Sequence, residues 1–580
     1  HVSGQFQSEK DYAPWKLTEV LVYSGSKVTR TDEEVKTLIA DKLEKWPHAN
    51  QVLVFWESAR PFDVYAIAPE LVGRPPLPYT EARQAAADER WAFVEQTARV
   101  VRKEFPQLKV LLGNSLSCGE LVAEVLRRKP PKGWFTHLGT EAINRTVHPE
   151  KPGHNFTTLA SRWLADTAKA LGYEYPVTYC PEGISRKPDT LGERVCTEWL
   201  VRDILVQHAL GFEDISGVGI HPESGNIYDG SFYGICALGR TPFMYPRLGY
   251  VATATLTRVL DRARFERFFP TGSDTVYAAE FSRPDGRKVY ALWTSRGTAE
   301  LSIEPGSREV ELVSLYGRSS RPPVWQRWRK RLTLTAGTGA RYLVTDTPLR
   351  AIACGRRAYP DNPVLPGFRV VDAVDSLSRW QPETETNRTF ETAGHYVING
   401  ITNVGADHRT LAVRPAVREV RDPEKGACLE IAIESNTNHH RLMQEYAVLM
   451  LKDPIALPPD AHTVGLWVKG NSGWGHVAWI LKDAAGRTYA SRSGIVGDYT
   501  GRASIDFDGW CFLSQPATAD SPIPELSTGG LSHLWGGTAK PPFQLAGLAF
   551  CAPAHPLYIN EYKARPQSIR IKDVSVLSGP

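Results

Sequence analysis

Short apolar segments alternate with amphipathic helical segments over the first part of the chain, and this alternation restricts the fold more than any other feature. Apolar runs begin near residues 51, 108, 134, 176 and 213, and each is followed by a helical pattern. Because these runs are apolar at nearly every position, we expect strands buried on both faces, as in parallel sheets. Repeated strand–helix units predict either a doubly wound sheet or a (β/α)8 barrel.

The barrel is the preferred α/β fold, because no G-x-G-x-x-G or Walker sequence follows any of the strands. One further unit precedes residue 51, with "KLTEVLVYSG" as its strand and "RTDEEVKTLIADKLEKW" as its helix. Six of the eight units of a TIM barrel are therefore visible, and we expect the first two to be missing from this sequence. Gly172 and Gly211 follow two of the helical patterns and predict their C-termini. This predicts an N-terminally incomplete barrel over residues 1–262.

The helical pattern disappears after residue 262. Segments such as "KVYALWTS", "EVELVSLYG" and "ARYLVTD" are short alternating strands separated by turn residues, and they predict a small β-sandwich over residues 263–358. After the proline-rich linker "RAYPDNPVLPG", a second all-β pattern with "HTVGLWVKG" and "SIRIKDVSVLS" predicts a jelly-roll sandwich over residues 359–580. The chain is thus expected to have a barrel followed by two all-β sandwich domains.

Composition excludes several classes of partner. The formal charge is +4, with no basic block or tail, so we expect no nucleic acid partner. No run of about 18 apolar residues occurs, so we expect no membrane span. The eight cysteines form no C-x-x-C pair and the histidines do not recur at ligand spacing, so we expect neither a metal site nor a cofactor.

Polar side chains follow the predicted strands at the positions where a barrel carries its active site. Two glutamates, Glu57 and Glu182, follow apolar strands three units apart. Opposed carboxylates at a barrel mouth are suited to acid-catalysed cleavage of an acetal, because one can act on the oxocarbenium-like centre while the other protonates the leaving oxygen. The other polar residues assigned to strand ends are His137, Glu141, His221 and Glu223.

The order of these strand-end residues resembles the clan A glycoside hydrolases, nearest in pattern to the β-xylosidase and α-L-iduronidase type. "VLVFWESARP" resembles their strand-four signature and "YPVTYCPEGIS" their strand-seven signature, while "GWFTHLGTEA" resembles strand six. The resemblance covers residues 50 to 355 and implies that Glu57 is the acid/base and Glu182 the nucleophile. It also implies that His137 lies in a sugar subsite or beside the nucleophile.

Two positions depart from the family pattern. Trp56 stands where the family has an asparagine before the acid/base, and Pro181 replaces the threonine before the nucleophile. Trp56 and Arg60 are the further substrate-binding candidates: a tryptophan can stack on a sugar ring, and an arginine can hold a uronate or sulfate by bidentate hydrogen bonds. The last domain resembles carbohydrate-binding jelly rolls, and Trp474 and Trp535 are candidates for exposed tryptophans that stack on sugars. The alternative is a structural sandwich that only braces the barrel.

The prediction is a retaining glycoside hydrolase acting on an oligo- or polysaccharide, secreted or periplasmic, with its oligomeric state left open. Two alternatives stay open at this point. The chain can be a non-catalytic carbohydrate-binding protein on a glycosidase scaffold, which the tryptophan at position 56 makes conceivable. It can also be a transglycosylase, in which a sugar acceptor replaces water.

Overall fold

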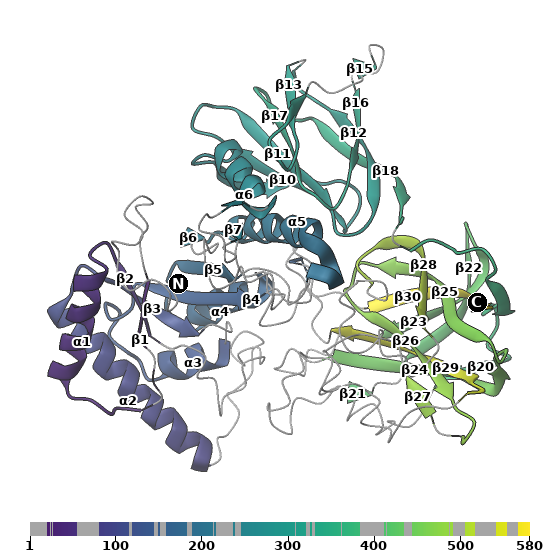
Figure 1. The fold of residues 1–580 in the computed structure, drawn as a ribbon, viewed down its shortest axis with the longest axis horizontal. Coiled ribbons are helices and arrows are strands. Elements are labelled where there is room, and N and C mark those ends of the chain that lie inside the picture. The colour runs from purple at the N-terminus through teal and green to yellow at the C-terminus, as the bar shows by residue number, and fades with distance from the viewer. Residues whose placement is uncertain are drawn as a thin grey trace. The chain divides into compact units, whose positions relative to one another are not determined.

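A computed structural model of the chain divides it into two compact units, His1–Glu150 with His154–Asp261 and Leu315–Gly317, and Lys151–Gly153 with Arg262–Ser314 and Arg318–Pro580 (Figure 1). The residues that the structure describes are 20–54 except 24 and 26, 81–114, 119–143, 149–150, 158–182, 188–215 except 213, 236–237, 245–246, 248–320 except 308, 325–326, 331–382 except 361, 411–412, 415–433, 444–490 except 487, 505–516, 541–553 and 567–579.

The first unit is built on a six-stranded sheet whose strands are all parallel and follow one another in chain order. All six predicted strand segments form strands of this sheet, so the predicted parallel sheet is confirmed. Among the described residues, the first strand pairs only with the second and the sixth only with the fifth. The strands are β1 (Val20–Tyr23), β2 (Gln51–Val54), β3 (Lys109–Asn114), β4 (His137–Ile143), β5 (Val177–Glu182) and β6 (Asp214–Ile215).

A helix connects each strand to the next, and the helix ends follow from local sequence. In α1 (Asp32–Lys45), the Thr31 side chain and Glu34 form a reciprocal capping box at the N-terminus. Gly172 and Gly211 have φ angles of 85° and 81° directly after two helices, so both predicted C-terminal glycines are confirmed. The other helices are α2 (Glu81–Glu104), α3 (Gly119–Arg127), α4 (Thr158–Ala170), α5 (Pro188–Ala209) and α6 (Leu248–Val259); β7 (Cys236–Ala237) and β8 (Tyr245–Pro246) form a short antiparallel pair.

One face of the parallel sheet carries the helices. Tyr23 of β1 stacks on Phe93 of α2 with ring centroids 5.3 Å apart, and Tyr23 pairs in register with Val54 of β2. A sheet that adds each strand on the same side through right-handed crossovers keeps its helices on one face. The described side chains that share this face are apolar and buried: Leu21, Tyr23, Val52, Val54, Val110, Leu112, Leu138 and Val177.

The opposite face is concave. A Cβ built at Gly139 in β4 would lie 2.6 Å from Leu53 Cδ1 in β2, although β3 runs between these strands. Bond lengths limit the two Cα atoms to about 8 Å apart in such a contact, whereas a flat sheet would separate them by roughly 12 Å. The sheet therefore curves toward this face, which we call the concave face. Register and alternation place on it Leu53, Lys109, Leu111, Gly113, His137, Gly139, Glu141, Ile143, Cys180 and Glu182.

The first part of the second unit is a small sandwich of two antiparallel sheets, one of order β14-β13-β17-β11-β10-β9 and one of order β15-β16-β12-β18. Leu292 and Leu343 from the first sheet and Leu301 and Leu334 from the second belong to one buried cluster. The strands are β9 (Arg264–Phe268), β10 (Val276–Ser282), β11 (Lys288–Thr294), β12 (Thr298–Glu304), β13 (Val310–Val313), β14 (Ser319–Ser320), β15 (Trp325–Gln326), β16 (Arg331–Ala336), β17 (Arg341–Thr345) and β18 (Ala351–Ala358).

The rest of the second unit is a larger sandwich. One sheet has the order β22-β23-β30-β25-β28 with β19 beside β30, and the other has the order β20-β24-β29-β26-β27 with β21 beside β24. From β23 onward the chain crosses between the sheets at nearly every connection, the pattern of a jelly roll. The strands are β19 (Arg369–Asp372), β20 (Trp380–Pro382), β21 (Leu411–Ala412), β22 (Ala416–Asp422), β23 (Gly426–Ile433), β24 (Gln444–Ala456), β25 (Ala461–Asn471), β26 (His476–Lys482), β27 (Thr488–Ala490), β28 (Asp508–Pro516), β29 (Gln544–Pro553) and β30 (Gln567–Ser578).

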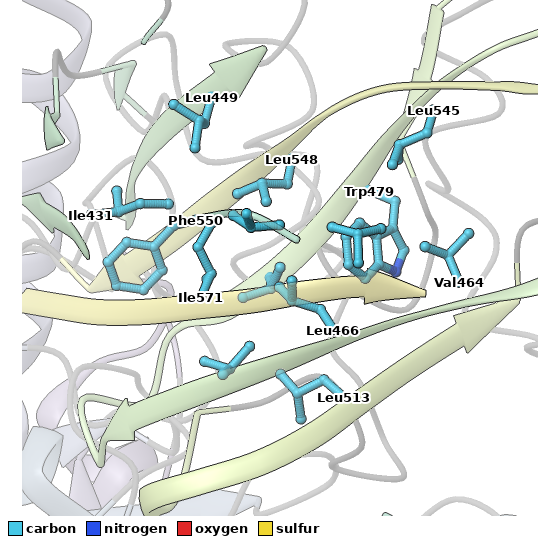
Figure 2. Packing of buried hydrophobic residues seen from close by; sticks show 14 of the residues in the cluster. Ile431, Leu449, Val464, Leu466, Trp479, Leu513, Leu545, Leu548, Phe550 and Ile571 are labelled. Atoms are coloured by element: carbon cyan, nitrogen blue, oxygen red, sulfur yellow. The ribbon is translucent and has the colours of Figure 1, made fainter. Parts of the chain in front are cut away.

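The core of the jelly roll lies between these two sheets. Its largest side chains include Trp479 and Phe550, each no more than 1% exposed. Figure 2 shows residues of both sheets meeting there: Ile431, Val464, Leu466, Leu513 and Ile571 from one sheet, and Leu449, Trp479, Leu545, Leu548 and Phe550 from the other.

A buried carboxylate fixes the end of the β22–β23 hairpin to its sheet. Asp422 is 1% exposed and accepts hydrogen bonds from Lys469 Nζ at 2.7 Å, Arg570 Nη1 at 2.8 Å and Trp510 Nε1 at 3.0 Å. Burial alone would raise the pKa of Asp422, but these hydrogen bonds outweigh it and hold that pKa well below its usual range. The charged form of Asp422 therefore stabilises the fold.

Replacing Gly113 with alanine should destabilise the first unit. The new Cβ would lie 1.6 Å from the carbonyl oxygen of Gly139, so the backbone must move, at a cost of about 2 kcal/mol. Thermal unfolding followed by the helical circular dichroism signal measures this, because the described helices all belong to the first unit. Gly133→Ala is the matched control, since a Cβ there meets nothing within 4 Å. Equal stability of the two variants would contradict the tight contact.

Replacing Asp422 with asparagine should weaken the jelly roll by about 2 kcal/mol at neutral pH, because the charge-assisted hydrogen bonds are lost. The pKa of Asp422 is lower in the folded than in the unfolded chain, so its contribution is complete above the ordinary value of 3.8 and disappears as the pH falls below it. Stability measured against pH should therefore decrease less steeply below that value in Asp422→Asn than in the wild type. The exposed Asp460→Asn variant should retain the wild-type slope.

Candidate active site

The candidate site lies at the edge where the parallel strands end. Because all strands of the first sheet run in the same direction, their last residues meet at one edge, which we call the carboxyl edge. In the described residues β2 ends at Val54, β4 at Ile143 and β5 at Glu182. Polar groups after these strands are therefore brought to the same side of the unit.

Glu182 is the last residue of β5 and pairs in register with Ile143, the last residue of β4. Glu141 lies two residues before Ile143 and pairs with Cys180 of β5. Alternation places Glu141 and Glu182 on the concave face, away from the helices. Two acidic positions on neighbouring strands thus share one face at the carboxyl edge.

The concave face changes character along the strands. Toward the amino ends it holds Leu53 and Leu111, which are buried, together with the side-chain-free position of Gly139. Toward the carboxyl ends, the positions of Glu141 and Glu182 follow. The positions of Lys109 and His137 lie on the same face toward the amino ends, so the face carries both leucines and polar residues there and the acidic positions nearer the carboxyl edge.

The glycines of this face were not singled out by the sequence analysis. Both stand inside apolar strand segments, in "VLLGNS" and "HLGTEA". A glycine within a strand often marks a close approach of another backbone. That signal could have identified Gly113 and Gly139 as positions where β3 and β4 approach closely.

The structure corrects the placement of His137. The sequence analysis assigned it to a strand end, but it is the first residue of β4, at the amino end. It is 8% exposed there, and the six residues that follow carry the strand roughly 20 Å toward the carboxyl edge. A role for His137 in a sugar subsite at the carboxyl edge is therefore not supported. Trp134, three residues earlier, stacks on Trp91 of α2 with ring centroids 6.2 Å apart.

Five other predicted site residues lie outside the described residues. Trp56, Glu57 and Arg60 follow β2, whose description ends at Val54, and His221 and Glu223 follow β6. Their assignments stay predictions. Of the predicted catalytic pair, the structure gives the backbone position of Glu182.

The structure describes one of the two tryptophans that were expected to stack on sugars in the jelly roll. Trp474 is 2% exposed, so the expectation that it is an exposed stacking platform is wrong. It lies in the turn between β25 and β26, where its backbone N–H donates to the carbonyl oxygen of Ile505. Trp535 lies outside the described residues.

Within the described ranges, no group of three or more His, Cys, Asp and Glu side chains is arranged to hold a metal ion. Among the helices in that part of the chain, none combines the length and the apolar character needed to cross a membrane.

No family model matches the chain, and no curated protein matches it. Among solved structures it is similar to a family 39 glycoside hydrolase from the gut symbiont Bacteroides cellulosilyticus WH2, with 14% identity, 57% of this chain and 74% of that chain covered, and a TM-score of 0.38. It is also similar to a glucosidase from Croceicoccus marinus, with 11% identity, coverages of 57% and 78% and a TM-score of 0.35. A family 11 carbohydrate-binding module of a Clostridium thermocellum cellulase matches at 9% identity, coverages of 37% and 95% and a TM-score of 0.19. At these TM-scores the similarities establish neither the fold nor the activity of this chain.

Proposed function

We propose that the chain is a retaining glycoside hydrolase whose parallel sheet belongs to a (β/α)8 barrel, with Glu182 as nucleophile and Glu57 as acid/base. The observation that carries the proposal is the position of Glu182, the last residue of β5 on the concave face. Glu57 follows β2 by three residues, and a strand continued with the same alternation would put it on the face of Leu53, which is also the concave face.

The curvature of the sheet supports this pairing. Strands β2 and β5 are three positions apart in the sheet, or roughly 14 Å if it were flat. A retaining mechanism requires the two carboxyl groups about 5–5.5 Å apart. Glutamates that extend inward from opposite sides of a curved wall can approach to that distance, whereas glutamates on a flat sheet cannot.

The proposed reaction has two steps. Glu182 attacks the anomeric carbon and forms a glycosyl ester, while Glu57 gives its proton to the departing oxygen. Glu57, now a carboxylate, then removes a proton from water as the water attacks the anomeric carbon and releases Glu182. For the first step Glu57 must be protonated near neutral pH, which burial and the neighbouring charge of Glu182 favour.

A 2-deoxy-2-fluoro glycoside with a good leaving group tests the proposal directly, because it should trap the glycosyl ester. Incubation with a panel of such sugars, followed by peptide mass spectrometry, should find the label on Glu182. Absence of labelling throughout a panel whose parent sugars are hydrolysed would refute the covalent mechanism. Absence of both turnover and labelling would favour the carbohydrate-binding alternative. Transfer to an added acceptor sugar in place of hydrolysis would identify a transglycosylase.

Glu182→Gln should lower kcat by about 10³-fold or more, and Glu57→Gln should lower it by 10²- to 10⁴-fold on substrates whose leaving group needs protonation. On a glycoside whose leaving group needs no protonation, added azide should accelerate turnover of Glu57→Gln and give a glycosyl azide of retained configuration, because azide attacks the glycosyl ester without a general base. It should not restore Glu182→Gln.

Two control variants belong to the opposite edge of the same sheet. Glu174→Gln changes an exposed acid just before β5, and His137→Gln changes the amino end of β4. Both should keep kcat within about twofold of the wild type, as expected for positions far from the carboxyl edge. A loss in either control as large as that of Glu182→Gln would contradict the placement of the site.

A further inference from the structure

The segment between the two sandwiches is packed against the jelly roll. The sequence "RAYPDNPVLPG" is typical of a free linker, yet the Tyr359 hydroxyl donates to the carbonyl oxygen of Asp508 at 2.7 Å, and its ring lies 5.6 Å from that of Phe507. At the other end of the segment, Phe368 meets Phe512 edge-on at 4.9 Å. The segment is thus anchored to the jelly roll at both ends.

A buried ion pair joins the two sandwiches. Arg296, in the turn between β11 and β12 of the small sandwich, donates from Nε to Asp506 Oδ1 of the jelly roll at 2.6 Å. The two side chains are 5% and 0% exposed. Ser295 Oγ donates to the carbonyl oxygen of Asp506 at 2.6 Å, and Arg296 Nη1 donates to Asn362 Oδ1 in the connecting segment.

A second cluster joins the sandwiches around Asp508, the first residue of β28. Its carboxylate accepts from Thr275 Oγ1 at 2.6 Å and from Arg357 Nη1. Arg357 also donates to Ser273 Oγ at 3.1 Å, so the small sandwich supplies a cation and two hydroxyl groups to this cluster. Asp506 and Asp508 lie two residues apart, and the two clusters therefore hold one short stretch of the jelly roll.

The turn that carries Arg296 packs closely on its own sandwich. Gly297 has a φ of +63°, and a Cβ there would lie 2.1 Å from the carbonyl oxygen of Ala358, the last residue of β18. A side chain at position 297 would therefore displace the turn that presents the guanidinium. Removing one partner while the other stays buried would leave a charge without compensation, which costs more than losing a surface ion pair.

We propose that the small sandwich and the jelly roll form a single cooperative unit, coupled through Arg296–Asp506 and Arg357–Asp508, so that the jelly roll is held in a fixed orientation on the small sandwich. The membership of both sandwiches in one compact unit of the chain agrees with this. The proposal is independent of any chemistry at the carboxyl edge of the first unit.

Amide hydrogen exchange of the full chain tests the coupling by perturbing one sandwich and observing the other. Leu548→Ala removes a fully buried side chain of the jelly-roll core, on a strand with no part in the two clusters. The slowest amides of β24, in the jelly roll, should then exchange at least about tenfold faster. If the unit is cooperative, the slowest amides of β11 in the small sandwich should accelerate by the same factor. Acceleration of β24 with unchanged β11 would overturn the proposal.

The Arg296→Met variant tests whether the Arg296–Asp506 ion pair is needed for the coupling between the two sandwiches. In this background Leu548→Ala should accelerate β11 by a clearly smaller factor than β24, because the ion pair is lost while the Arg357–Asp508 cluster still joins the sandwiches. Arg331→Met is the matched control, because Arg331 is a half-exposed arginine of the same sandwich that pairs with Glu304 on the surface. Leu548→Ala should still affect both strands in that background.

Persistence of the full effect on β11 in Arg296→Met would remove the pair from the coupling mechanism. If Arg296→Met does not fold, the double variant Ser295→Ala and Thr275→Val takes its place, since it keeps both charges while removing two hydrogen bonds across the interface. It should reduce the factor by which β11 accelerates below that of β24. Equal factors in this variant would also contradict the assignment.

Discussion

The one-sided growth of the parallel sheet is the constraint on which the candidate site depends. Each new strand is added next to the previous one in chain order, so right-handed crossovers put all the connecting helices on one face. In the part of the chain that the structure describes, the other face is the side toward which the sheet curves. The side chain of Leu53 in β2 extends past β3 and reaches Gly139 in β4. The positions of Glu141 and Glu182 lie on that face at the carboxyl edge.

The strands and helix ends of the first unit could be predicted because each depends on local sequence: apolar runs for the strands, and Gly172 and Gly211 for two helix ends. Strand limits could not be predicted as well. The segment "GWFTHLGTEA" has apolar residues on both sides of His137, so its composition does not show that Trp134 packs on a helix and that the strand begins at His137. That shift of three residues moved a histidine from one edge of the sheet to the other. Glu182 was placed correctly at a strand end, because a proline and a glycine confine the strand closely.

The burial of Trp474 shows why the exposure of a side chain is harder to predict from sequence than secondary structure. Glycines on both sides of this tryptophan are typical of an exposed turn, and the turn does exist. However, the Asn471 side-chain amide donates to Gln567 Oε1 at 2.8 Å, and Gln567 Nε2 donates to the carbonyl oxygen of Gly473 at 3.0 Å. These hydrogen bonds hold the turn against the protein. Gln567 is nearly a hundred residues away, and such a partner cannot be inferred from the turn sequence. The tryptophan has a positive φ of 61° in this turn.

The close fit at Gly139 also fixes the register of β4. A slip of two residues would preserve the alternation of faces, so alternation alone does not exclude it. In β4 it would bring His137 or Glu141 to the position beneath Leu53 and Leu111, where even a methyl group lies 2.6 Å from its neighbour. Gly139 thus fixes the register of β4 against its neighbours. It sets the height of the Glu141 position relative to the Glu182 position along the two strands.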